Sequence, residues 1–216
     1  MIETDGYELI RDVFRESELE EYRIEANSLA KEEGQICVRH IRKKSKCFDD
    51  LAMSQRLKAL LPLDSLSPVR SILFDKTGDS NWPVAWHQDL TINVKNQVEV
   101  ADYGPWSQKD GVPHVQPPES LLERMVTVRV HLDDTPESNG ALKVMPRSHL
   151  LGKVPSEKVR AFGEEVICEC KPGDVLLMKP LLFHASARSR KPAKRRVIHY
   201  EFAPRDVLDP SLNWYE

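Results

Sequence analysis

Short apolar segments that alternate with polar residues dominate the chain from about residue 69 onward. The clearest spans 124–132, where every second residue from Val126 to Leu132 is apolar, as expected of a strand with one buried face. The same reasoning predicts strands at 69–76, 83–89, 141–145, 164–170, 175–184 and 195–202. A turn signal at 171–174 (KPGD) predicts that the segments on either side of it form a hairpin.

The first third of the chain instead carries apolar residues near helical spacing. Ser17 and Glu20 fit a capping box and Gly34 is a natural stop, which predicts a helix between them. A second helix is predicted from Ser54 to Pro62. Short strands that follow a helical N-terminus are typical of a mainly β protein, a sandwich or open barrel with flanking helices.

The length of 216 residues is that of one domain, 1–216, with N-terminal helices at about 15–62 and a β core at about 69–203. A net charge of −3 and a pI of about 6.2 exclude the strongly basic surface of a nucleic-acid-binding domain. The basic run at 39–46 is therefore expected to be a solvated surface segment. The sequence contains no coiled-coil heptads, so it does not indicate an oligomeric state.

No apolar run approaches the length that spans a membrane, and the N-terminus is acidic and mixed rather than a secretory signal. A cytoplasmic protein is therefore expected, with no membrane partner. Four cysteines show no metal-binding spacing, so they are expected to be reduced packing residues: Cys37, Cys47, Cys168 and Cys170. The segment at 92–122 carries four prolines and is expected to be a long loop that covers a functional site.

Candidate chemistry centres on the sequence from Trp86 to Asp89 (WHQD). In a strand, His87 and Asp89 point to the same face, where an imidazole and a carboxylate can take adjacent positions on one metal ion. Two histidines and one carboxylate leave three positions open, an arrangement typical of non-haem Fe(II) oxygenases. This short motif alone is weak, because a surface or capping pair has the same spacing.

His184 is a candidate for the third ligand, because it ends the apolar strand KPLLFH. Arg195 follows it by eleven residues, at the start of the next alternating segment. A histidine ligand with an arginine on the next strand suits 2-oxoglutarate, whose keto-acid end chelates the metal while its far carboxylate needs a buried, bidentate cation.

At this point the chain resembles the phytanoyl-CoA dioxygenase family of Fe(II)/2-oxoglutarate enzymes, over roughly residues 35 to 203. The stretches that carry the resemblance are LFDKTGDSNWPVAWHQDL, VHLDDTPESNGALKVMPRSHL and HASARSRKPAKRRVIHYEF. The resemblance implies a double-stranded β-helix (jelly-roll, cupin-like) core. It assigns Fe(II) to His87, Asp89 and His184, with 2-oxoglutarate and dioxygen as cosubstrates. Arg195 is implied to bind the distal carboxylate, supported by a hydrogen bond from Ser186.

The resemblance also places Ile72 in the cosubstrate pocket. Several family members have an aromatic residue on the central strand, where this chain has Arg129, which could serve the cosubstrate or the substrate. The turn at 146–149 reads PRSH where the family often has PGSH. Arg195 and Arg196 are adjacent, so a slip of one residue would exchange their roles, and the spacing from His184 favours Arg195.

The implied reaction hydroxylates or otherwise oxidises a C–H bond of a small, polar molecule and releases succinate and CO2. Related halogenases lack the metal carboxylate, so Asp89 indicates oxidation without halogenation. A natural-product tailoring step is the leading substrate class, and the candidate substrate residues are Arg70, Trp106 and His199. Two alternatives stay open: a cupin-like metalloenzyme that does not use 2-oxoglutarate, and a non-catalytic small-molecule binding protein on the same fold.

Overall fold

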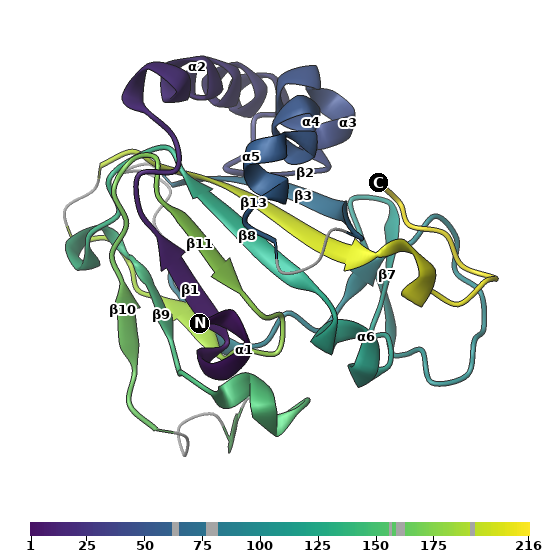
Figure 1. Ribbon diagram of the computed structural model, residues 1–216. Coiled ribbons are helices and arrows are strands. Elements are labelled where there is room, and N and C mark those ends of the chain that lie inside the picture. Colours follow the sequence, from purple (N-terminus) through teal and green to yellow (C-terminus); the bar gives the residue numbers. More distant parts are fainter. Residues whose placement is uncertain (62–64, 77–81, 156, 159–162, 191–192) are drawn as a thin grey trace.

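The computed structural model describes residues 1–61, 65–76, 82–155, 157–158, 163–190 and 193–216, and within them the chain forms a layered, mainly β structure (Figure 1). A six-stranded antiparallel sheet carries helices on one face, and a four-stranded sheet lies on its other side. A three-stranded sheet adjoins them. The mainly β prediction with flanking helices is confirmed.

The six-stranded sheet has the order β1-β11-β8-β13-β3-β2. Its strands are β1 (Tyr7–Ile10), β2 (Cys37–Arg39), β3 (Leu66–Lys76), β8 (Val126–His131), β11 (Val175–Met178) and β13 (Arg195–Pro204). The four-stranded sheet, in the order β10-β9-β12-β4, comprises β10 (Val166–Cys168), β9 (Leu142–Val144), β12 (His184–Ser186) and β4 (Val84–His87). The third sheet, in the order β5-β7-β6, comprises β5 (Ile92–Asn93), β7 (Val112–Val115) and β6 (Trp106–Lys109).

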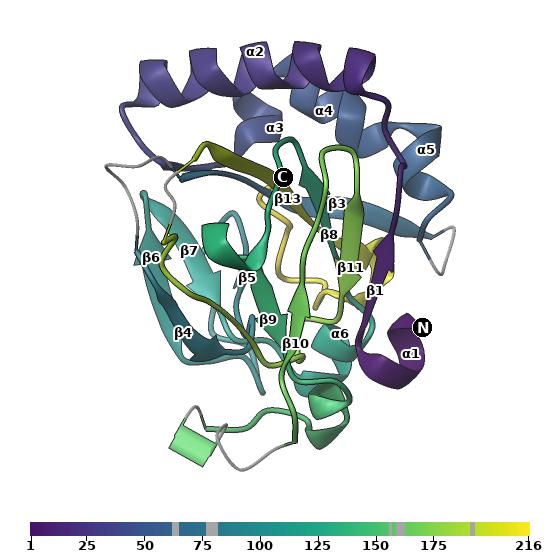
Figure 2. The same ribbon diagram turned by 90° about the vertical axis from the view of Figure 1, so that its left-hand side faces the viewer.

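The helices between residues 16 and 58 cover the outer face of the six-stranded sheet, with the long α2 running across it (Figure 2). The α-helices are α1 (Ile2–Asp5), α2 (Glu16–Glu33), α3 (Ile41–Lys44), α4 (Lys46–Met53), α5 (Gln55–Lys58) and α6 (Glu119–Glu123). Short 3₁₀ helices span Glu137–Asn139, Ser148–Leu151 and Arg205–Val207. Among the described residues, no helix combines the length and apolarity needed to cross a membrane.

The main core lies between these helices and the sheet. It joins Leu19 of α2 and Phe48 of α4 to Leu73 of β3 and Tyr200 of β13, all fully buried. The Tyr200 hydroxyl donates a hydrogen bond to the Phe48 carbonyl oxygen at 2.7 Å, which satisfies its polar atom inside the core. Because side chains alternate along a strand, the residues between these core positions point to the other face of the sheet.

Several local predictions for the helices need correction. Helix α2 begins at Glu16, and its N-cap is Arg15, whose backbone N–H donates to the Glu18 carboxylate at 2.8 Å. The capping box therefore lies two residues before the predicted one, while the predicted stop at Gly34 is confirmed, with φ of 62°. Ser54 caps a helix as predicted, but α5 covers only 55–58, and the predicted end at Pro62 lies outside the described residues. The basic segment at 39–46 includes α3.

The hairpin predicted around 171–174 is wrong. Strand β10 pairs with β9 in one sheet, whereas β11 pairs with β1 and β8 in the other, so the turn carries the chain between sheets. The strand predicted at 175–184 divides for the same reason: after β11 a turn closed by the Leu182 N–H on the Lys179 carbonyl leads into β12. The loop predicted at 92–122 instead contains β5, β6, β7 and α6.

Gly173 is the position in this turn that only glycine fits. Its φ is 91°, and a Cβ atom built there would overlap the backbone carbonyl oxygen of Phe14. The Phe14 N–H donates to the Gly173 carbonyl oxygen at 3.1 Å, so this turn is hydrogen-bonded to the segment between β1 and α2. We expect Gly173→Ala to lower the free energy of unfolding by about 3 kcal/mol, measured by urea denaturation.

The matched control is Gly34→Ala. Gly34 also has a positive φ, of 62°, but a Cβ there would meet nothing within 4 Å. The control should therefore show only the cost of the backbone conformation, about 1 kcal/mol. Equal losses in the two variants would contradict the close contact at Phe14.

Candidate active site

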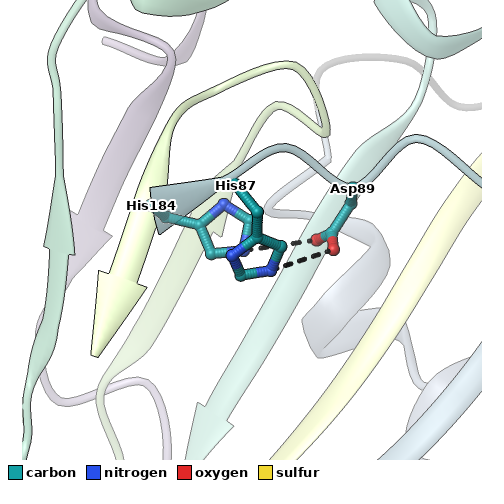
Figure 3. A group of neighbouring side chains, drawn as sticks. All are labelled: His87, Asp89 and His184. Atoms are coloured by element: carbon teal, nitrogen blue, oxygen red, sulfur yellow. Dashed lines mark ion pairs between the residues drawn. The ribbon is translucent and has the colours of Figure 1, made fainter. Parts of the chain in front are cut away.

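Three potential metal ligands converge where β4 and β12 lie side by side (Figure 3). His87 ends β4, His184 begins β12, and the two residues are register partners. The Nε2 atoms of His87 and His184 lie 3.8 and 3.6 Å from the two carboxylate oxygens of Asp89. One ligand atom from each residue lies within 4.8 Å of the others, so the group could hold a metal ion.

The direction of the Asp89 side chain has a different structural cause from the one predicted. Strand β4 ends at His87, so strand alternation does not set the direction of the Asp89 side chain. Instead the Asp89 backbone N–H donates to the Pro180 carbonyl oxygen at 2.9 Å, which ties the segment to the turn before β12. The side chain still turns toward both histidines (Figure 3).

The hydrogen bonds of the two rings suit metal binding. Nδ1 of His87 lies 2.8 Å from the Ala85 carbonyl oxygen, and Nδ1 of His184 lies 2.9 Å from that of Leu182. A carbonyl oxygen only accepts, so each Nδ1 carries the proton and each Nε2 presents a lone pair toward the cluster. The Asp89 Oδ2 atom is buried and has no hydrogen-bond donor among the described residues. The donor set therefore fits a divalent metal ion of the Fe(II) type.

The protonation states agree with this arrangement. Burial lowers the pKa of His184 to about 4, against the opposing charge of Asp89, so the ring is neutral at pH 7. Burial acts to raise the pKa of the Asp89 carboxyl, but His184, His199 and His87 outweigh it and hold that pKa below its usual range. The cluster therefore presents a carboxylate and the neutral imidazole of His184, with the His87 ring beside them.

A pocket of about 150 Å³ opens beside the cluster, between the two large sheets. Its lining combines the potential metal ligands, three cations, a serine, a further histidine and apolar or aromatic side chains: Phe74, Lys76, Trp82, Val84, His87, Asp89, Arg129, Leu142, His184, Ser186, Arg195 and His199. The three cations outnumber the one carboxylate in the lining. The pocket is therefore suited to an anionic ligand.

Arg195 and Ser186 lie together in this pocket. The Arg195 guanidinium donates to the Gly140 carbonyl oxygen, and its Nε has no partner among the described residues. Burial, with the nearby charge of Arg129, lowers the pKa of Arg195 to about 10, which leaves it a cation at pH 7. Arg196 turns to the other face of β13 and binds the Asp133 carboxylate at 2.7 Å. The geometry therefore places Arg195, and not Arg196, in the pocket.

Arg129 also faces the pocket and is held by a buried chain of polar groups. Its guanidinium donates to Nδ1 of His199 at 3.1 Å, and its Cζ lies 5.4 Å from the Phe74 ring centroid. His199 Nε2 lies 3.4 Å from Glu201 Oε1, which also accepts from Arg70 at 2.9 Å. The chain of Arg70, Glu201 and His199 thus fixes the direction of Arg129.

A second group of potential ligands, Asp89, His199 and Glu201, also lies within 4.8 Å. Two of its members, His199 and Glu201, are already engaged. Because His199 accepts from Arg129 at Nδ1, its proton is on Nε2 and points to Glu201, which leaves no lone pair for a metal. The group formed by His87, Asp89 and His184 is therefore the better metal site.

Three residues predicted for the site lie outside the pocket lining. Ile72 is buried and pairs with His199 across β3 and β13, but Phe74 and Lys76 supply the wall on that strand. Arg70 is engaged by Glu201. Trp106 packs against a separate apolar cluster that contains Val115.

Lys76 is a further cation of the pocket, and it was not among the residues predicted for the site. It follows Ile72 and Phe74 on the same face of β3 and is the register partner of Arg195. The alternation of β3 and the antiparallel pairing with β13 were the signals that could have found it.

The comparisons with known proteins agree with this fold. The model of the phytanoyl-CoA dioxygenase (PhyH) family matches residues 2–197. None of the curated proteins matches the chain in sequence. Among solved structures, the α-ketoglutarate-dependent epimerase SnoN from nogalamycin biosynthesis is 20% identical, with a TM-score of 0.71, over 93% of this chain and 78% of its own.

Two further structures are similar. HygX from Streptomyces hygroscopicus, with nickel and 2-oxoglutarate bound, is 21% identical, with a TM-score of 0.65, over 94% of this chain and 84% of its own. EctD from S. alaskensis is 19% identical, with a TM-score of 0.71, over 94% of this chain and 75% of its own. At this level of identity the likeness shows the fold, and it confirms the predicted jelly-roll core.

The family match bears on the predicted cofactors as well. Fe(II), 2-oxoglutarate and dioxygen are the cofactors of this family, and the donor set and cation-lined pocket fit the first two. The match covers most of the chain, and among the strands of the two large sheets only β13 extends beyond its end at residue 197. The chain belongs to the phytanoyl-CoA dioxygenase family.

Proposed function

We propose that the chain, as one oxygenase domain, is an Fe(II)- and 2-oxoglutarate-dependent dioxygenase that hydroxylates or otherwise oxidises a C–H bond of a small, polar molecule. One observation carries this proposal above the others. A cluster of two histidines and one carboxylate opens into a pocket whose three cations form no ion pair with a carboxylate of the described residues. Neither a metalloenzyme that does not use an oxo acid nor a simple binding protein needs both features.

The residues divide into three tasks. His87, Asp89 and His184 hold Fe(II), which with 2-oxoglutarate and dioxygen supplies the oxidation of a C–H bond, with succinate and CO2 as co-products. Arg195 binds the distal carboxylate of the cosubstrate, and the Ser186 hydroxyl adds a hydrogen bond. Arg129, held in place by His199, serves the end of the cosubstrate nearer the metal.

The apolar lining has its own part in the chemistry. Phe74, Val84 and Leu142 line the pocket beside the cations. They limit the water around the reacting groups, which strengthens each charged contact and protects the oxidant from side reactions. Asp89 occupies one metal position, which favours hydroxylation or a related oxidation over halogenation.

The substrate class is the least determined part of the proposal. The matches to proteins of antibiotic biosynthesis, such as SnoN, favour a natural-product tailoring step. Arg70 and Trp106, predicted as substrate residues, lie outside the cavity lined by the metal cluster. His199 is in that lining but is engaged by Arg129 and Glu201.

An anaerobic titration tests the proposal. The protein is loaded with Fe(II), 2-oxoglutarate is added, and the visible charge-transfer band of the chelate is followed. We expect the wild-type protein to give the band and Arg195→Ala to raise the dissociation constant for 2-oxoglutarate about a hundredfold. The reason is that the substitution removes a buried, bidentate partner of a carboxylate.

The control for this titration is Arg205→Ala, an exposed arginine just beyond the end of β13, which should leave the affinity unchanged. Iron binding by the wild-type protein without any band would contradict the proposal. That outcome would favour a cupin-like metalloenzyme that does not use 2-oxoglutarate.

A further inference from the structure

Lys76 ends β3 deep inside the pocket and is only 5% exposed. Its ammonium group donates to the Trp82 carbonyl oxygen at 2.8 Å and to the Ser186 hydroxyl oxygen at 3.3 Å. The ammonium also lies 4.7 Å from the centroid of the Trp82 ring. An ammonium group has three donors, so one remains for a ligand in the pocket.

Among the described residues, three other buried cations are matched by carboxylates, whereas buried Arg129 is held by the His199 ring. Arg70 pairs with Glu201, Arg196 with Asp133, and Lys179 with Glu3. Within the described ranges, neither Lys76 nor Arg195 forms an ion pair with a carboxylate. A buried cation without a counter-charge is strongly unfavourable, so two of them on paired residues indicate a place for an anion.

The charges around the pocket agree with this. Burial, followed by the nearby charges of Arg195 and Arg129, lowers the pKa of Lys76 to about 7. An anion placed between Lys76 and Arg195 would relieve this repulsion and stabilise the charged ammonium.

We propose that Lys76 and Arg195 together hold the distal carboxylate of the cosubstrate, one cation from each of two paired strands. This inference rests on the proposed function and adds a residue to it. Ser186 connects the two: its oxygen accepts from Lys76, which leaves its hydroxyl proton free to be donated to the same carboxylate. Lys76 thereby acts as a specificity residue for oxo acids that carry a second carboxylate.

The test compares two ligands in two proteins. The ligands are 2-oxoglutarate and 2-oxobutyrate, which has the same keto-acid end but no distal carboxylate. The proteins are the wild type and Lys76→Met, which keeps an unbranched apolar chain without the charge. Dissociation constants come from anaerobic titration of the charge-transfer band, so the readout does not depend on turnover.

We expect Lys76→Met to raise the dissociation constant for 2-oxoglutarate about tenfold to a hundredfold and to change that for 2-oxobutyrate by less than about twofold. Lys76→Arg should restore part of the affinity for 2-oxoglutarate. The matched control is Lys179→Met, a buried lysine that also donates to a backbone carbonyl, that of Glu123, but lies outside this pocket. It should leave both constants unchanged.

Melting temperature and Fe(II) affinity are measured for each variant, and Lys76→Gln is used if the methionine variant does not fold. Unchanged 2-oxoglutarate affinity in the folded variant, or an equal loss of affinity for both ligands, would overturn the proposed role of Lys76. Neither outcome would affect the proposed function. A wild-type protein that binds Fe(II) but gives no band with either ligand would overturn the proposed function and this inference with it.

Discussion

Replacing Asp89 with alanine is expected to weaken Fe(II) binding more than about a hundredfold and to abolish 2-oxoglutarate-dependent succinate formation. Asp89 is the anionic member of the cluster, and each of its two oxygens lies within 4 Å of the Nε2 atom of a different histidine. Removing it takes away one ligand and the negative charge that offsets the cations of the pocket. Calorimetric titration with Fe(II) under anaerobic conditions measures the first effect.

Asp89 belongs to both groups of potential ligands, so a second pair of variants is needed to separate them. His87→Ala should lose iron binding much as Asp89→Ala does. His199→Ala should retain it within about tenfold, because that ring is engaged by Arg129 and Glu201. Loss of iron from the His199 variant with retention in the His87 variant would place the metal in the other group.

Replacing Arg70 with methionine is expected to lower the free energy of unfolding by about 3–5 kcal/mol. The Arg70 guanidinium lies 2.9 Å from Glu201 Oε1, and the Glu201 side chain is only 3% exposed. Removing the cation leaves a buried carboxylate whose remaining described partner is the His199 ring. Urea denaturation measures the loss, and the midpoint should fall without a large change in slope.

The double variant Arg70→Met/Glu201→Gln should recover part of that loss, because it removes both charges together. Arg124→Met is the exposed control: its side chain is 52% exposed and lies 3.8 Å from Asp206, a pair worth about 0–1 kcal/mol. A stable Arg70→Met protein with only a raised KM for the substrate would instead support the substrate role predicted from the sequence.

The structure and the sequence agree most closely along the central strands. Strand β8 falls inside the segment predicted at 124–132, and β13 extends two residues beyond the one predicted at 195–202. These strands have one face in the helix-covered core, so their alternation is visible without any tertiary information. The sequence also contained the two histidines, the carboxylate and Arg195 at a recognisable order and spacing.

The disagreements come from pairing between distant segments. A turn such as 171–174 has the same local signal whether it closes a hairpin or carries the chain from one sheet to another, and here it does the latter. The segment at 92–122 was rich in proline, yet its short strands pair with one another and form a small sheet. The local propensity of a segment does not specify which distant segment it pairs with.

The sequence by itself determined the mainly β class, the positions of the central strands along the chain, and the presence of a histidine–carboxylate–histidine set followed by an arginine. Only the tertiary structure decided which buried cations form an ion pair with a carboxylate of the described residues and which do not. The side chains of Arg70 and Lys76 lie on the inner face of β3. Arg70 meets Glu201 on β13, whereas Lys76 lies across from Arg195, which has no carboxylate partner among the described residues. The register of β3 on β13 sets these partners, and a charge is neutralised or left for a ligand by what lies across from it.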